Sequence, residues 1–253
     1  MKVLKDVVLG VLFLGLSFST VAYGEEANSK ITLNSDIVVS NLTTVVSTDI
    51  NKVTTENGDS AEIVANVNNL ETLEIRMKID NAESLEIDKD FNVIKIANSD
   101  EKLSFFDVVD EHGNNLNDKV ITETVEGNNI IQTLNVSDVQ GDVVATAYAK
   151  GAFSYSHYFN WSKWITRDKK KSLSISPKSS LTGGTSNPNY NAIRASDSWD
   201  RIVEKHGKDG NWSNTSGMKS QYICHYNWAK LKTPWNIEPW RKGNANAGNL
   251  CNP

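Results

Sequence analysis

The sequence predicts a mainly β protein with minor α content, divided into two unlike halves. Three observations lead to this fold class. Short alternating apolar runs fill residues 61–150, the charge balance reverses near Lys150, and both cysteines fall in the second half. We therefore expect a small antiparallel β module followed by a disulfide-closed α+β domain with one short helix.

Residues 1–24 have the pattern of a signal peptide. A positively charged start is followed by an apolar run over 7–18, and small residues precede a predicted cleavage between Gly24 and Glu25. The run is short for a membrane span, and no later stretch approaches 18 apolar residues. An uncleaved N-terminal anchor is the alternative. We expect a secreted, extracellular mature chain without a transmembrane segment, and association with the cell wall is a further expectation.

The charge of the chain is strongly asymmetric. Residues 25–148 carry 24 acidic and 8 basic side chains, whereas residues 149–253 carry 6 acidic and 16 basic ones. All seven tryptophans and three of the four histidines also lie in the second half. This break predicts a domain boundary near Lys150-Gly151. The opposite charges further predict docking of the acidic half on the basic half, with separate solvated domains as the alternative.

The predicted organisation has four parts. They are the signal peptide (1–24), a low-order segment (25–60), an acidic antiparallel β module (61–150) and a basic, Trp-rich C-terminal domain (151–253). The segment 25–60 is rich in Ser, Thr, Asn and Asp, so we expect little regular structure there. In the module, apolar residues recur at every second position between Gly and Asn turns, which is typical of antiparallel strands.

The C-terminal domain is expected to combine strands, loops and one helix. Alternating aromatic residues over 153–161 predict a strand, and the basic stretch 167–171 predicts a solvated turn before another strand. Residues 179–191 predict a polar loop. Residues 195–210 predict the helix, with Asp197 as its N-cap.

The two cysteines are predicted to form a disulfide. Alternation over 218–229 predicts a strand that places Cys224 and His225 on opposite faces. A Cys-His metal site would need further ligand spacing that the sequence lacks, so neither a metal nor a cofactor is expected. An exported chain favours a bond between Cys224 and Cys251, worth about 3.5 kcal/mol in the chain-entropy model.

Several blocks of the second half carry a resemblance to a known family. They are "SWDRIV" (198–203), "MKSQYICH" (218–225), "WNIEPWR" (235–241) and the closing "CNP". From about Tyr155 to Pro253, the chain resembles the family called domain of unknown function 2599. That family is found at the C-terminus of exported proteins, chiefly of Gram-positive bacteria. The resemblance implies that Cys224, Trp235, Pro239, Trp240 and Arg241 belong to a family signature, and it assigns no activity.

The composition favours a binding function over catalysis. The motifs of nucleophile-elbow hydrolases, phosphate-loop proteins, zinc proteases and calcium loops are missing from the sequence. A basic domain with seven tryptophans can attract anionic polymers and stack sugar rings on aromatic faces. We therefore interpret the protein as a secreted module that binds an anionic cell-wall polymer or glycan at the cell envelope.

Two alternatives remain open. The first is a secreted hydrolase or toxin with unidentified catalytic residues, for which His157, His225 and Glu238 are the residues to test. The second is a stable disulfide-closed fold that serves a partner protein.

The candidate binding residues are aromatic or charged and lie in the C-terminal domain. They are Trp161, Trp164, Trp235, Trp240, Arg241, Lys242, His225 and Glu238. No catalytic residue is assigned. The two Pro-Trp pairs of the segment 232–240 are interpreted first as a buried clamp that closes the irregular tail and second as a stacking platform. Arg241 and Lys242 are expected to face a ligand.

Overall fold

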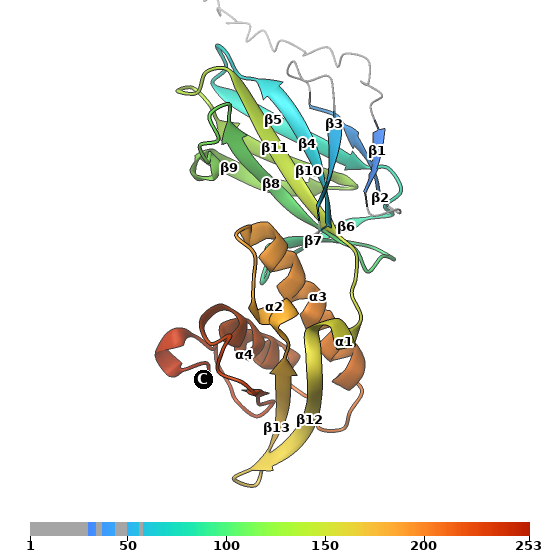
Figure 1. Ribbon diagram of the computed structural model, residues 1–253, viewed down its shortest axis with the longest axis vertical. Helices are drawn as coiled ribbons and strands as arrows, with labels where there is room; N and C mark the ends of the chain where they lie inside the picture. The colour runs from blue at the N-terminus through green and yellow to red at the C-terminus, as the bar shows by residue number, and fades with distance from the viewer. Residues whose placement is uncertain (1–29, 34–36, 44–49, 56–57) are drawn as a thin grey trace, which may run out of the picture.

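The structure is a computed structural model that describes residues 30–33, 37–43, 50–55 and 58–253. The predicted signal peptide and its cleavage site between Gly24 and Glu25 lie outside the described residues. The described part is mainly β with antiparallel sheets, which confirms the predicted fold class. Figure 1 shows the strand-rich first half above the second half, where the long helices lie.

Two antiparallel sheets make up the first half. The first has the strand order β1-β2-β5-β10-β9, and the second has the order β3-β4-β11-β8-β7-β6. The first sheet contains β1 (Lys30–Leu33), β2 (Ile37–Asn41), β5 (Thr72–Ile79), β9 (Val120–Glu126) and β10 (Asn129–Asn135). The second contains β3 (Ile50–Thr55), β4 (Gly58–Asn66), β6 (Leu85–Asp88), β7 (Val93–Ile96), β8 (Lys102–Asp110) and β11 (Asp142–Lys150). A short 3-10 helix, η1 (Asn117–Lys119), precedes β9.

Alternating burial along the strands creates a core between the two sheets. In β5, the apolar residues at every second position, Leu73 to Ile79, are fully buried. Residues from both sheets belong to one apolar cluster, so the sheets pack as a sandwich. The buried side chain of Gln132 joins them. It accepts a hydrogen bond from the Phe106 N–H (2.9 Å) and donates one to the Phe106 carbonyl (3.1 Å).

The segment 25–60, which we expected to have little regular structure, contributes strands. Its described residues form β1, β2, β3 and the start of β4. Leu33, Val39 and Ile50 from this segment are buried in the sandwich core. This burial orders a stretch whose Ser, Thr and Asn content by itself favours loops, because strand preference depends largely on packing context.

The second half contains a three-stranded antiparallel sheet and two long helices. The sheet has the order β12-β13-β14. In chain order, the elements of the second half are α1 (Tyr155–Tyr158), β12 (Phe159–Arg167), β13 (Lys170–Pro177), α2 (Ser179–Thr182), α3 (Pro188–His206), α4 (Thr215–Trp228), β14 (Trp235–Ile237) and the 3-10 helix η2 (Ala247–Asn249). A second apolar cluster packs residues of the sheet against α3 and α4, with Trp199, Tyr222 and Trp235 among its largest members.

Residues 218–229 form most of helix α4 and not the predicted strand. Met218, Gln221, Tyr222 and His225 are all buried, at the i, i+3, i+4 and i+7 spacing of a helix. The strand interpretation followed the alternation of aromatic and apolar residues. Because α4 is buried on more than one face, its sequence shows no single apolar stripe, and the polar buried residues hide the helical period.

Helix α3 begins at Pro188, earlier than the predicted start near residue 195. The side chain of Asn187 accepts hydrogen bonds from the N–H groups of Asn189 (2.8 Å) and Tyr190 (3.0 Å), and proline follows the cap. Asp197, which we predicted as the N-cap, is buried inside the helix. The predicted loop 179–191 therefore contains α2 and the start of α3.

The aromatic stretch 153–161 is only partly extended. It holds the single helical turn α1 and the first residues of β12, and the adjacent Tyr158 and Phe159 are both buried, which a regular strand facing one core does not allow. The predicted basic turn after it is confirmed. Asp168 and Lys169 both have positive φ angles (47° and 64°), and they join β12 to β13.

The two halves contact each other through charges of both signs. Lys219 of α4 pairs with Asp88 (2.8 Å) and Asp90 (2.7 Å) of the first half. In the opposite sense, Lys102 of β8 pairs with Asp200 of α3 (2.9 Å). Phe91 and Val93 also pack into the second apolar cluster. Within the part of the chain that the structure describes, no helix has the length and apolar character needed to cross a membrane.

Candidate functional site

A pocket of about 270 Å³ lies at the end of the C-terminal half, where four separate segments meet. The segments are the end of β12, helix α4, the stretch that contains β14, and the tail that follows Cys251. The lining residues are Arg167, His225, Lys232, Pro234, Asn236, Arg241 and Asn252. We call this the basic pocket, because three of these residues carry positive charge and none carries negative charge.

The stretch that contains β14 is fixed against α4 and β13. Ile175 and Leu173 of β13 pair with Trp235 and Ile237 of β14. Trp235 is fully buried and its ring contacts Tyr222 of α4, with ring centres 5.5 Å apart. A strand of three residues is not stable alone. Pairing with β13 along one edge and aromatic packing on one face hold it in place.

Gln221 provides a further attachment between α4 and this stretch. Its side chain accepts a hydrogen bond from the Glu238 N–H (2.9 Å) and donates one to the Glu238 carbonyl (3.0 Å). Gln221 is fully buried, so both main-chain groups of Glu238 are satisfied inside the protein. This pairing fixes the main chain that carries the Glu238 carboxylate, which pairs with two lining residues of the basic pocket, Arg167 and Arg241.

The predicted disulfide between Cys224 and Cys251 is confirmed, with a Cα–Cα distance of 5.4 Å. It ties the C-terminal tail to α4 and brings Asn252 to the wall of the basic pocket. His225, the next residue in α4, is buried as well. Because successive helical residues are separated by about 100°, Cys224 and His225 are not on opposite faces, as the predicted strand would have placed them.

The cationic side chains of the basic pocket outnumber their carboxylate partners. The Glu238 carboxylate is buried and pairs with Arg241 through Nε and with Arg167 through Nη1 (3.9 Å). Arg241 also donates from Nη1 to the main-chain oxygen of Pro253 (3.2 Å). Within the described residues, Lys232 makes no ion pair or hydrogen bond through its ammonium group. One carboxylate therefore orients two guanidinium groups and leaves positive charge unmatched.

Three polar atoms of the lining residues lack hydrogen-bond partners within the described part of the chain. They are both ring nitrogens of His225 and Oδ1 of Asn236. Burial lowers the pKa of His225. Two smaller effects raise it and offset the burial only in part: the charge of Glu238, and a contact with the Asn236 backbone that lies outside hydrogen-bond geometry. His225 is therefore neutral near pH 7, with one nitrogen as donor and the other as acceptor.

This arrangement is suited to holding an anion. Guanidinium groups present several N–H donors in a planar fork that matches carboxylate and phosphate oxygens. Unpaired buried polar groups cost about 1–3 kcal/mol each, a cost that a ligand with oxygen acceptors and hydroxyl donors would reduce. A hydroxyl-bearing anionic group has both kinds of atom.

The predicted binding residues are distributed over three places. His225 and Arg241 line the basic pocket, whereas Glu238 and Trp235 are buried and do not line it. Trp240 is half-exposed, and its ring contacts both Lys170 Nζ (3.8 Å) and the Arg241 guanidinium (4.5 Å). The clamp interpretation thus describes Trp235, whereas Trp240 orients Arg241 at the surface.

The remaining predicted residues are not brought together with the pocket. Trp161 and Trp164 belong to β12, where Trp164 packs edge-on against His206 (6.3 Å). Lys242 is exposed and does not line the pocket. His157 is stacked on Phe153 (4.0 Å) and is not a lining residue either. The three residues of the hydrolase alternative therefore do not share this pocket.

Sequence reasoning missed five lining residues: Arg167, Lys232, Pro234, Asn236 and Asn252. Arg167 was assigned to a solvated turn, and the fold brings it to a carboxylate 71 residues away in the sequence. A usable signal was the short separation of Lys232, Asn236 and Arg241 around the family block. Among the described residues, no group of three or more His, Cys, Asp or Glu side chains is placed to hold a metal ion.

Comparison with known proteins places this pocket within a region that matches a family model. The family model described as "Protein of unknown function (DUF2599)" matches residues 159–253, which confirms the resemblance of the C-terminal region and includes every lining residue. An uncharacterized protein of Mycobacterium tuberculosis and one of Mycobacterium bovis are each 27% identical to this chain over 121 residues, covering 44% of this chain and 78% of the relative. No solved structure matches the chain.

Proposed function

We propose that the protein is a secreted, non-enzymatic binding module that holds an anionic group of a cell-envelope polymer or glycan in the basic pocket. The observation that carries the proposal is the pocket's composition. Arg167, Lys232 and Arg241 surround a space of about 270 Å³ over a single buried carboxylate, Glu238. The phosphate or carboxylate groups of envelope polymers have the charge and the oxygen acceptors that these side chains can pair with.

Secretion is part of the proposal. The pattern of residues 1–24 supports export, and the Cys224–Cys251 disulfide is of a kind that persists in oxidising compartments. Binding is favoured over hydrolysis because the lining residues include no serine, cysteine or carboxylate, and Glu238 is occupied by two arginines.

Among the described residues, none from the acidic half lines the basic pocket. The residues of the second half that pair with charges of the first half include Lys219, Asp200 and Arg201, and none of them lines the pocket. The proposed ligand site is therefore compatible with the observed contacts between the halves.

The proposal is tested by co-sedimentation of the purified mature protein with purified Gram-positive cell walls over a range of salt concentrations. We expect salt-sensitive binding that Lys232→Gln weakens about tenfold, the loss typical of one charge-assisted contact. Lys208→Gln is the matched control, because Lys208 is exposed and lines neither the basic pocket nor the surface beside it. Equal wall affinity of Lys232→Gln and the wild type would refute the pocket as the binding site.

A further inference from the structure

We propose that the basic pocket also holds the phosphate of a phospholipid head group, and that an adjoining apolar groove takes part of its acyl chain. This inference rests on the proposed function, because it uses the same pocket, and it adds an anionic bilayer surface to the envelope polymers as a ligand. Three observations carry it. The groove has exposed apolar side chains, it shares a lining residue with the basic pocket, and neither set of lining residues includes an acidic side chain.

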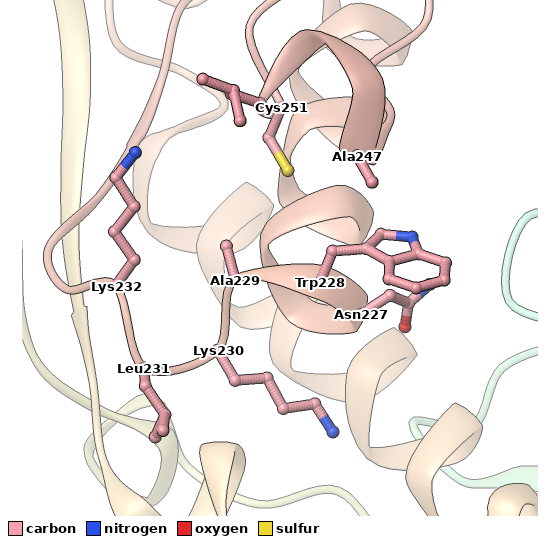
Figure 2. A pocket seen from close by; sticks show the side chains of 9 residues that line it. Asn227, Trp228, Ala229, Lys230, Leu231, Lys232, Ala247 and Cys251 are labelled. Atoms are coloured by element: carbon pink, nitrogen blue, oxygen red, sulfur yellow. The ribbon is translucent and has the colours of Figure 1, made fainter.

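The groove has a volume of about 520 Å³ and lies between the end of α4 and the C-terminal tail. Figure 2 shows Leu231 and Lys232 on one side of it and Trp228 on the other, with Ala247 and Cys251 above. The remaining lining residues are Asn227, Ala229, Lys230 and Leu250. This size lies in the range of about 300–1,000 Å³ that is usual for small-molecule sites.

The apolar side chains of the groove are unusually exposed. Trp228, Leu231 and Leu250 have exposed fractions of 73%, 89% and 69%, the highest among the large apolar residues that the structure describes. Leu250 adopts a positive φ of 54°, a conformation that a side-chain-bearing residue rarely takes. Several exposed apolar side chains around one depression are typical of a surface that is covered by a ligand or membrane.

The groove and the basic pocket share a wall. Lys232 lines both, and the disulfide residue Cys251 lines the groove while its neighbour Asn252 lines the pocket. An amphiphile with its charged group among Arg167, Lys232 and Arg241 can therefore extend its apolar part past Lys232 toward Leu231. Neither lining set contains an acidic residue, so both surfaces are complementary to a negatively charged membrane.

The residue types also agree with an interfacial location. Tryptophan is enriched at the level of lipid head groups, and lysine beside apolar residues is typical of surfaces that bind anionic bilayers. Trp228 and Leu231 supply the apolar contact, and Lys230 and Lys232 supply the charge. A soluble polymer without an acyl chain would use only the basic pocket and would leave the groove uncovered.

The test is co-sedimentation of the full mature chain with vesicles of phosphatidylcholine alone and of phosphatidylcholine mixed with phosphatidylglycerol. We expect binding to the mixed vesicles at least tenfold tighter than to the neutral ones. Leu231→Ser and Trp228→Ala should each weaken binding to the mixed vesicles about tenfold and leave binding of inorganic phosphate unchanged. Ile121→Ser, at a half-exposed position of β9 in the first half, is the matched control and should retain binding.

The outcomes separate this inference from the proposed function. If Leu231→Ser and Trp228→Ala bind mixed vesicles within twofold of the wild type, the groove is not a lipid site and the inference is overturned. Wild-type binding to phosphate and cell walls without binding to vesicles would overturn the inference and leave the proposed function standing. If Lys232→Gln leaves phosphate binding unchanged, the proposed function itself fails. A dimer that Leu231→Ser dissociates would show that a second copy covers the groove and would also overturn the inference.

Discussion

The side-chain amide of Gln221 pairs with both main-chain groups of Glu238, at 2.9 Å and 3.0 Å. The Gln221 side chain, from helix α4, thus makes the two main-chain hydrogen bonds that a neighbouring strand would otherwise make just after the end of β14. It fixes the residue whose carboxylate holds Arg167 and Arg241 in the basic pocket. The geometry of the cations therefore depends on a buried residue that does not itself contact the pocket.

Replacing Gln221 with alanine should lower the free energy of unfolding by about 2–4 kcal/mol, because two buried main-chain groups of Glu238 lose their partners. Urea denaturation measures the change. Gln140→Ala, at an exposed position, is the control and should remain within about 0.5 kcal/mol of the wild type. A change of similar size in both variants would contradict the assigned role of Gln221.

Reduction of the Cys224–Cys251 disulfide should destabilise the protein by about 3 kcal/mol and weaken anion binding as well. The reason for the second effect is that the bond holds Asn252 and the Pro253 oxygen that Arg241 contacts. Urea denaturation and phosphate titration with and without a reductant provide the measurements. If reduction lowered stability but left phosphate affinity unchanged, the tail would have no part in the site.

The lowered pKa of His225 makes stability depend on pH. Burial disfavours the charged imidazole in the folded state, whereas the unfolded chain takes up a proton near its ordinary value of 6.5. This contribution to stability is fully present above pH 6.5 and is lost as the pH falls toward the pKa of the folded state. His225→Gln should therefore lose less stability than the wild type between pH 7.5 and pH 5.

Burial also lowers the pKa of His157 and of His206. These two histidines make the same contribution to the pH dependence of stability in the wild type and in His225→Gln. The difference between the two denaturation curves isolates His225. Parallel curves for the wild type and His225→Gln would show that this side chain is not buried as described.

Replacing Lys219 with methionine should destabilise the contact between the two halves. Lys219 and Lys95 outweigh the burial that would raise the pKa of Asp88, and together they keep it below its usual range. Without Lys219, the Asp88 carboxylate loses its closest ion-pair partner, and we expect a loss of about 1–3 kcal/mol. Lys89→Met, at an exposed position beside Asp88, is the control. An unchanged midpoint of urea denaturation for Lys219→Met would show that the ion pair between Lys219 and Asp88 does not stabilise the contact between the halves.

The sequence was most informative where burial follows a simple period. The strands of the sandwich were predictable because one face of each, as in β5, is apolar at every second residue. Helix α4 was missed because Gln221 and His225 are polar yet buried. Polar residues at these core positions interrupt the apolar period of 3.6 residues that would have indicated a helix. The first strands were missed because their polar residues surround a few core positions, such as Val39.

The site was predictable in part for the same physical reasons. His225, Glu238 and Arg241 were candidates because they lie in the two sequence blocks, 218–225 and 235–241, that carry the family resemblance. Arg167 could not be found, because only the pairing of β12 with β13, and of β13 with β14, places it near Glu238. Long-range sheet pairing of this kind leaves no local signal in the sequence.

The central claim is that an anion binds among Arg167, Lys232 and Arg241 beside His225. The most direct test is a titration of the protein with inorganic phosphate, followed by the NMR signals of the histidine rings. The account predicts a saturable shift of the His225 signals that Lys232→Gln weakens about tenfold, while His112, His157 and His206 remain unchanged. Shifts at the other histidines with none at His225 would contradict it.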